Sequence, residues 1–132
     1  MPFAKLTLSI APSSAEAERL SRDLTDLIAS ELGKRHELTS VLIDVPSTCF
    51  WTIGGSRRNI AAHLEVRVTA GTNSEHEKRV FIASAMARLR RTFPDLDPAT
   101  YIVVTEIAST DWGYDGMSQA DRAKQKRLSE PV

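Results

Sequence analysis

The residue best placed for chemistry is Pro2, which directly follows the initiator methionine. Aminopeptidases usually remove methionine before a small residue such as proline, so we expect Met1 to be removed. The nitrogen of Pro2 would then be a secondary amine held rigid by the pyrrolidine ring. An ordinary α-amine titrates at roughly 7.7–8, and burial lowers its pKa because burial disfavours the cation. Pro2 is therefore a candidate base, although a proline can also simply begin a strand.

A strand pattern begins immediately after Pro2 and would hold the amine in place. Apolar and polar side chains alternate up to residue 10, which is typical of a half-buried strand. Chain ends usually fray, whereas this end is predicted to be fixed by burial. The apolar face of the strand is Ala4, Leu6, Leu8 and Ile10.

The rest of the chain twice repeats the order strand, helix, strand. Capping boxes at 13–16 and 74–77 open the predicted helices, and Gly33 and Pro94 end them. The predicted strands cover 4–10, 38–45, 60–69 and 101–107, and the predicted apolar stripe of the second helix is Ile82, Met86, Leu89 and Phe93. Two consecutive β-α-β units predict an α/β fold with a four-stranded sheet and two helices on one face. The opposite face is left without cover, which favours oligomerisation.

The composition argues against several classes of function. The 132 residues include 17 basic and 17 acidic side chains, so no charge excess predicts binding to nucleic acid or to an anionic membrane. No apolar run approaches the ~18 residues of a membrane span, and no signal peptide is predicted. Cys49 is the only cysteine, which favours a cytoplasmic protein. The three histidines lack metal-ligand spacing, so no metal is expected.

The character of the sequence changes near its end. Residues 1–116 are predicted to form one domain, and residues 117–132 are predicted to form a charged C-terminal tail. Within the tail, 119–128 has helical character over a turn or two. Met117 and Leu128 supply most of its apolar surface, so we expect the tail to be loosely held.

These motifs together resemble the tautomerase superfamily over about residues 2–115. The Met-Pro start and the doubled β-α-β pattern are the broadest similarity. Residues 38–41 and 50–55 resemble the second strand and the aromatic-x-Ile-Gly-Gly loop of the 4-oxalocrotonate tautomerases. Residues 32–34 resemble the end of the first helix in the macrophage migration inhibitory factors. Residues 111–114 resemble a late aromatic segment of the malonate semialdehyde decarboxylases.

The resemblance implies a homotrimer and keto–enol chemistry catalysed by the amino-terminal proline, with no cofactor. Pro2 would be the general base, because one group must both take and return a proton. A cation would bind the carboxylate of the substrate. The candidates for substrate binding are Lys34, Trp51, Arg57, Arg58, Tyr101 and Trp112. Each also has a structural interpretation: Lys34 could complement a helix dipole, the arginines could belong to a solvated loop, and the aromatic residues could pack in a core or an interface.

The sequence also departs from the family at positions that bear on the substrate. Pro12 and Leu42 stand where the 4-oxalocrotonate tautomerases carry arginines, and Gly71 and Asn73 stand where the decarboxylases carry an arginine pair. These departures favour a small 2-oxo acid, phenylpyruvate-like, over a diacid. The alternatives are a proline-dependent hydratase, dehalogenase or decarboxylase of small unsaturated or 3-oxo acids, and a non-enzymatic trimeric binding protein of the same fold.

Overall fold

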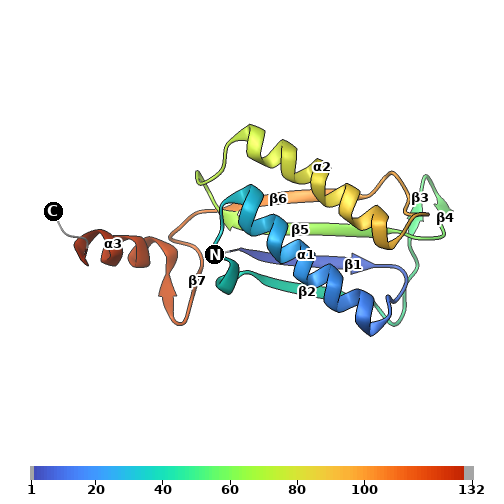
Figure 1. Ribbon diagram of the computed structural model, residues 1–132, viewed down its shortest axis with the longest axis horizontal. Helices are drawn as coiled ribbons and strands as arrows, with labels where there is room; N and C mark the ends of the chain where they lie inside the picture. The colour runs from blue at the N-terminus through green and yellow to red at the C-terminus, as the bar shows by residue number, and fades with distance from the viewer. Residues whose placement is uncertain (1, 130–132) are drawn as a thin grey trace.

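The computed structural model describes residues 2–129, in which two helices cover one face of a four-stranded sheet (Figure 1). Met1 and residues 130–132 lie outside the described part of the chain, and with them the predicted loss of Met1 and the end of the predicted tail. In chain order the elements are β1 (Phe3–Leu8), α1 (Ser14–Leu32), the 3₁₀ turn η1 (His36–Leu38), β2 (Ser40–Asp44), β3 (Thr52–Ile53), β4 (Ser56–Arg57), β5 (Ala62–Thr69), α2 (Glu75–Thr92), β6 (Tyr101–Ile107), β7 (Gly113–Tyr114), β8 (Met117–Ser118) and α3 (Gln119–Ser129).

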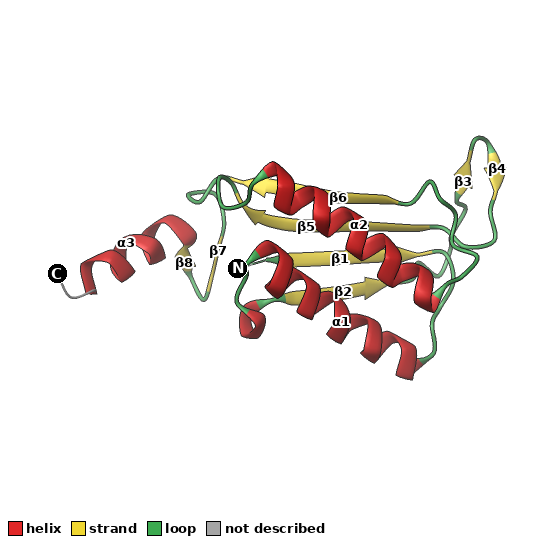
Figure 2. Ribbon diagram, turned by 45° about the horizontal axis from the view of Figure 1, so that its top comes forward, coloured by secondary structure: helices red, strands yellow, loops and turns green. Residues whose placement is uncertain are grey.

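The sheet has the strand order β2-β1-β5-β6. β1 runs parallel to β2 and β5 runs parallel to β6, while the two central strands β1 and β5 are antiparallel. Each parallel pair is joined by a helix, and both helices lie on the same face (Figure 2). The predicted α/β class and the two consecutive β-α-β units are confirmed.

The helices begin and end where local chemistry predicts. In both capping boxes the serine hydroxyl accepts a hydrogen bond from the backbone amide of the glutamate, and the glutamate side chain accepts one from the backbone amide of the serine. In the box that opens α1, both hydrogen bonds are 3.1 Å long. Gly33 ends α1 with φ +66°, a left-handed conformation that favours glycine. The Nδ2 atom of Asn73 then donates to the carbonyl of Leu32 at 2.8 Å. Asn73 therefore joins the turn before α2 to the end of α1.

The core lies between the sheet and the helices, and it corrects two of the predictions. Phe81 rather than Ile82 faces the sheet, and Ile82 is 41% exposed. The buried stripe of α2 is Phe81, Ala85 and Leu89, so the predicted periodicity was right and its phase was wrong by one residue at this point. Ile10 lies beyond the end of β1 and is 44% exposed. The fully buried core side chains of the central strands are Ala4, Leu6, Leu8, Leu64, Val66 and Val68.

The other face of the sheet is not covered by either helix, and it carries charged side chains together with the exposed apolar side chains Leu42 and Tyr101. Lys5 and Asp44 approach each other at 3.9 Å, and Arg67 pairs with Glu65 at 3.2 Å. The hydroxyl of Thr105 donates to the second carboxylate oxygen of Glu65 at 2.8 Å. Ion pairs thus lie on the face of the sheet that the sequence predicted to be left uncovered by the helices. Between residues 2 and 129, no helix combines the length and the hydropathy that crossing a membrane requires.

The chain ends in a hairpin and a helix that extend away from the sheet (Figure 1). Asp115 and Gly116 have φ of 51° and 78°, and they form the tight turn between β7 and β8. The predicted boundary between 116 and 117 therefore falls inside this hairpin. The short helical segment predicted at 119–128 is an eleven-residue helix, α3. No residue between Gln119 and Ser129 is buried.

Candidate active site

Pro2 is fully buried at the start of the central strand β1. Its carbonyl accepts a hydrogen bond from the amide of Ser40 at 3.2 Å, which joins it to the start of β2. On the other side, Phe3 is paired with Arg67 of β5, and this antiparallel register places Pro2 opposite Val68, close to the end of β5. Two neighbouring strands therefore hold the residue that the sequence singled out as the base.

Lys34 lies at the same end of the sheet, directly after the left-handed Gly33. Its Nζ donates to Oγ1 of Thr72 at 2.7 Å, and Thr72 in turn donates to the carbonyl of Thr69 at 2.6 Å. Burial of the half-buried ammonium group lowers the pKa of Lys34, while the charges of Glu77 and Glu106 oppose that shift. Lys34 is thus a positioned cation that loses its proton more easily than a solvated lysine.

Trp112 is the third predicted site residue at this end. Its indole Nε1 donates to Oγ1 of Thr69 at 3.1 Å. The turn from Thr69 to Thr72 is therefore hydrogen-bonded to both Trp112 and Lys34, and it lies at the end of the sheet that also holds Pro2. The structure brings Pro2, Lys34 and Trp112 to one end of the subunit.

Trp51 and Tyr101 lie at the opposite end of the sheet. They line a cavity of about 310 Å³ together with His63 and Ala99, beside the β3–β4 hairpin. Tyr101 begins β6 and is paired with His63 at the start of β5, whereas Pro2 lies where β5 ends. Within one subunit these aromatic side chains and Pro2 do not share a site.

Arg57 and Arg58 also belong to that distant end. The guanidinium of Arg57 stacks over the ring of Phe50 at 5.2 Å from its centroid. Arg58 approaches Asp97 with 3.5 Å between Nε and Oδ2, so this carboxylate already balances part of its charge. At the Pro2 end of the same subunit, Lys34 is the one predicted cation among the described residues.

Several residues of these two groups were missed by the sequence reasoning. Thr72 belongs to no motif in the sequence, although its hydroxyl positions Lys34. Glu77 is recognisable from the sequence as part of a capping box, but its charge also acts on Lys34. His63 is one of four alternating polar residues of β5, so the pattern gave no signal for the cavity that it lines. In residues 2–129 no group of three or more His, Cys, Asp or Glu side chains could hold a metal ion.

Comparison with known proteins rests on the fold, since no protein-family model and no curated protein matches the sequence. The native fused 4-OT structure has a TM-score of 0.81 at 19% identity and covers 92% of this chain and 98% of its own. Pt0534 inactivated by 2-oxo-3-pentynoate has a TM-score of 0.82 at 12% identity, over 91% and 98% of the two chains. A macrophage migration inhibitory factor-like protein from Entamoeba histolytica has a TM-score of 0.74 at 17% identity, over 89% and 97%.

These matches show the fold: the chain folds as fused 4-OT, Pt0534 and the migration inhibitory factor-like protein do. The resemblance predicted from the sequence is thereby confirmed for the fold. More particularly, the chain is similar to fused 4-OT and to a migration inhibitory factor-like structure over nearly the full length of each.

Proposed function

We propose that the protein is a tautomerase that interconverts the keto and enol forms of a small, phenylpyruvate-like 2-oxo acid. The observation that carries this proposal is the burial of Pro2 at the start of β1, at the end of the sheet that also holds Lys34. With Met1 removed, Pro2 offers a neutral secondary amine in a protected position. The fold supports the proposal, and the single cysteine, Cys49, supports a cytoplasmic location.

The proposed mechanism moves one proton through Pro2. The amine takes a proton from C3 of the substrate, the electrons of the C3–H bond form the C2=C3 double bond, and the carbonyl electrons move to oxygen. The prolinium then returns the proton to that oxygen, which gives the enol and the free amine. Lys34 binds the carboxylate of the substrate, which is present in the ketone, the enolate and the enol alike. The reverse sequence converts the enol to the ketone.

We further propose that the active unit is a homotrimer in which neighbouring subunits share each site. The subunit separates Pro2 and Lys34 from the aromatic cavity of Trp51 and Tyr101, which lies at the other end of the sheet. An assembly that places the aromatic end of one subunit beside Pro2 of the next would unite the two groups. One solved structure of similar fold is described as a fused 4-OT wild type asymmetric trimer. The face of the sheet that no helix covers also leaves Leu42 and Tyr101 exposed, and the burial of these apolar side chains favours assembly.

Mass spectrometry with an electrophilic 2-oxo acid tests the proposal directly. The natively expressed protein should show a mass without methionine. The probe 2-oxo-3-pentynoate, with which Pt0534 was inactivated, carries a triple bond conjugated to its ketone that a neutral amine can attack. The adduct should be found on the N-terminal peptide, at Pro2, with loss of phenylpyruvate tautomerase activity. A mass that retains methionine throughout would make Pro2 an amide and would favour a non-enzymatic binding protein.

The pKa of Lys34 gives a second expectation. Because burial lowers this pKa, the cation should be lost below the ordinary lysine value of about 10.4. The KM for the 2-oxo acid should therefore rise as the pH is raised towards that value, with less change in kcat, because a carboxylate anchor binds substrate and transition state alike. Lys34→Arg should remove this alkaline rise, since arginine stays charged.

Glu77→Gln provides a matched control for the pH profile. The charge of Glu77 raises the pKa of Lys34, so its removal should start the rise in KM at a lower pH. Glutamine preserves the capping box and therefore the start of α2. Identical profiles of KM against pH for wild type, Lys34→Arg and Glu77→Gln would contradict Lys34 as the anchor.

A further inference from the structure

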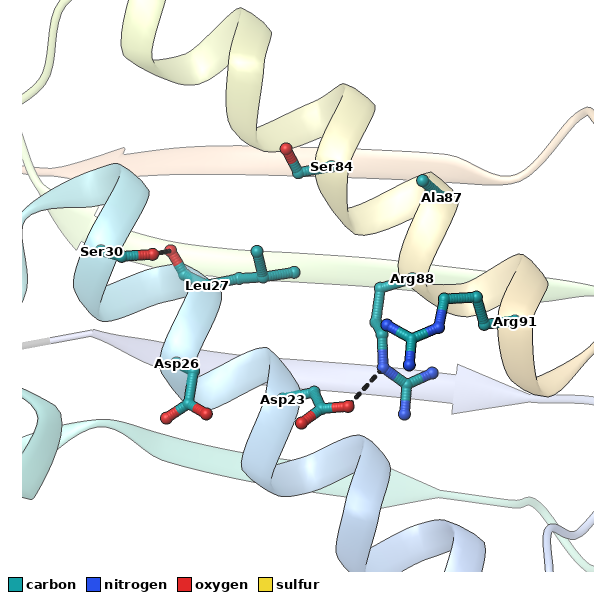
Figure 3. A pocket seen from close by; sticks show the side chains of 8 residues that line it. All are labelled: Asp23, Asp26, Leu27, Ser30, Ser84, Ala87, Arg88 and Arg91. Carbon is teal, nitrogen blue, oxygen red and sulfur yellow. Dashed lines mark hydrogen bonds and ion pairs between the residues drawn. The ribbon is translucent and has the colours of Figure 1, made fainter.

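A polar groove lies between α1 and α2 on the side of the helices that faces away from the sheet (Figure 3). The groove has a volume of about 420 Å³, and each helix lines it with four residues at the spacing i, i+3, i+4 and i+7. This spacing places the four residues on one helical face. The polar lining consists of Asp23, Asp26 and Ser30 from α1 and of Ser84, Arg88 and Arg91 from α2.

One ion pair fixes the two walls of the groove. Nε of Arg88 donates to Oδ2 of Asp23 at 2.7 Å, and its Nη1 donates to Oγ1 of Thr92 at 2.8 Å. Arg88 is only 8% exposed, so this pair is held rigidly between the helices. The charges of Arg88 and Asp23 balance each other and leave the remaining charges of the groove for a ligand.

The remaining charges have opposite signs on opposite helices. Asp26 on α1 uses one carboxylate oxygen in a 2.8 Å contact with Nε2 of His36. Arg91 on α2 has no hydrogen bond or ion pair with another side chain among residues 2–129. Figure 3 shows Asp26 on one wall and Arg91 on the other, with Ser30 and Ser84 towards the same end of the groove.

We propose that this groove binds a small zwitterion that carries one ammonium and one carboxylate group, as a free α-amino acid does. The ammonium group pairs with Asp26, and the carboxylate accepts the guanidinium of Arg91, a pairing that is often bidentate. The hydroxyls of Ser30 and Ser84 receive a polar side chain. The volume lies in the range of small-molecule sites.

The charge arrangement selects the zwitterion over simpler ions. A plain anion would be attracted by Arg91 but repelled by Asp26 and Asp23, and a plain cation would be attracted by the aspartates but repelled by Arg91. Like-charge contacts of this kind are a common source of discrimination between ligands. The groove lies on the helical side of the sheet and contains neither Pro2 nor Lys34. Its occupancy is therefore independent of the proposed tautomerase activity.

An NMR titration of the full chain tests the proposal with ligands and their matched halves. L-serine, L-threonine and L-asparagine are added to ¹⁵N-labelled protein, and ethanolamine and 3-hydroxypropionate serve as the cationic and anionic halves of serine. At least one amino acid should give saturable shifts of the α1 and α2 groove amides with a Kd of about 1–10 mM. Ethanolamine and 3-hydroxypropionate should bind at least about tenfold more weakly.

Variants then separate the groove from general surface charge. Arg91→Ala and Asp26→Asn should each weaken binding by about tenfold. Arg90→Ala removes the exposed neighbouring arginine of α2, which does not line the groove, and it should leave binding unchanged. The ¹⁵N spectra of all three variants show whether they are folded. The proposal is overturned if none of the amino acids gives saturable shifts, if the halves bind as well as the whole, or if Arg91→Ala binds as tightly as Arg90→Ala.

Discussion

Pro2→Ala should lower the tautomerisation of phenylpyruvate by roughly 10²–10⁴-fold, which is the usual contribution of a positioned general acid or base. Methionine is also removed before alanine, so the variant keeps a free terminal amine. That amine is primary rather than secondary, and it lacks the ring that holds the nitrogen in one orientation. The loss should appear mainly in kcat, measured from the absorbance of the enol, because the missing interaction is with the transferred proton.

The control for this variant is Pro12→Ala. Pro12 is also an early proline, but it lies in the loop between β1 and α1 and not at the sheet end that holds Lys34. Its replacement should leave kcat close to that of wild type. Equal activities of wild type and Pro2→Ala on a panel of 2-oxo and unsaturated acids would contradict the mechanism, and the non-enzymatic alternative would then be favoured.

Mixing two inactive variants should restore activity if each site is shared between subunits. In Tyr101→Ala the aromatic cavity is damaged but Pro2 remains, and in Pro2→Ala the reverse holds. In a mixed cyclic trimer, a site that takes Pro2 from the first variant and Tyr101 from the second is intact. Every mixed cyclic trimer, whichever variant it contains twice, has one such interface, so about a third of the sites in the selected mixed trimers should be intact.

The complementation experiment has a direct readout and a clear control. The variants are co-expressed with different affinity tags, purified in series to select mixed oligomers, and assayed with phenylpyruvate. Two separately tagged preparations of Pro2→Ala, treated in the same way, should stay inactive. Recovery no greater than in this control, in mixed trimers verified by mass, would show that one subunit holds the complete site or that Tyr101 has no part in it.

The elements that sequence reasoning predicted well are those with strong local signals. Ser13 and Ser74 form their capping boxes because each motif is complete within four residues. The predicted strand 101–107 matches β6 residue for residue, since β-branched residues fill positions 102–105. By contrast, one more apolar residue next to Phe81 shifted the predicted stripe of α2 onto Ile82.

The arrangement of the candidate site could not be read from the sequence, because it depends on strand register. Lys34 and Thr72 are 38 residues apart, and only the packed sheet shows that they meet. Trp51 seemed suitable as a wall beside Pro2, but the hairpin that follows it lies at the far end of β5. The contact of Arg58 with Asp97, 39 positions further along the chain, is likewise visible only in the folded subunit, and the role of Arg58 as an anchor stays a prediction. Pairings of this kind come from tertiary structure, which composition and periodicity do not encode.

The central place of β1 also sets the timing of Met1 removal. Pro2 is fully buried, is joined to Ser40 on one side and lies near the end of β5 on the other, so the folded subunit encloses the residue that loss of methionine would uncover. Strand β5 is synthesised about 60 residues after β1, which takes roughly 3–12 s at ordinary rates of synthesis. We therefore expect an aminopeptidase to act on the nascent chain, before β5 pairs with β1 and the middle of the sheet closes around Pro2.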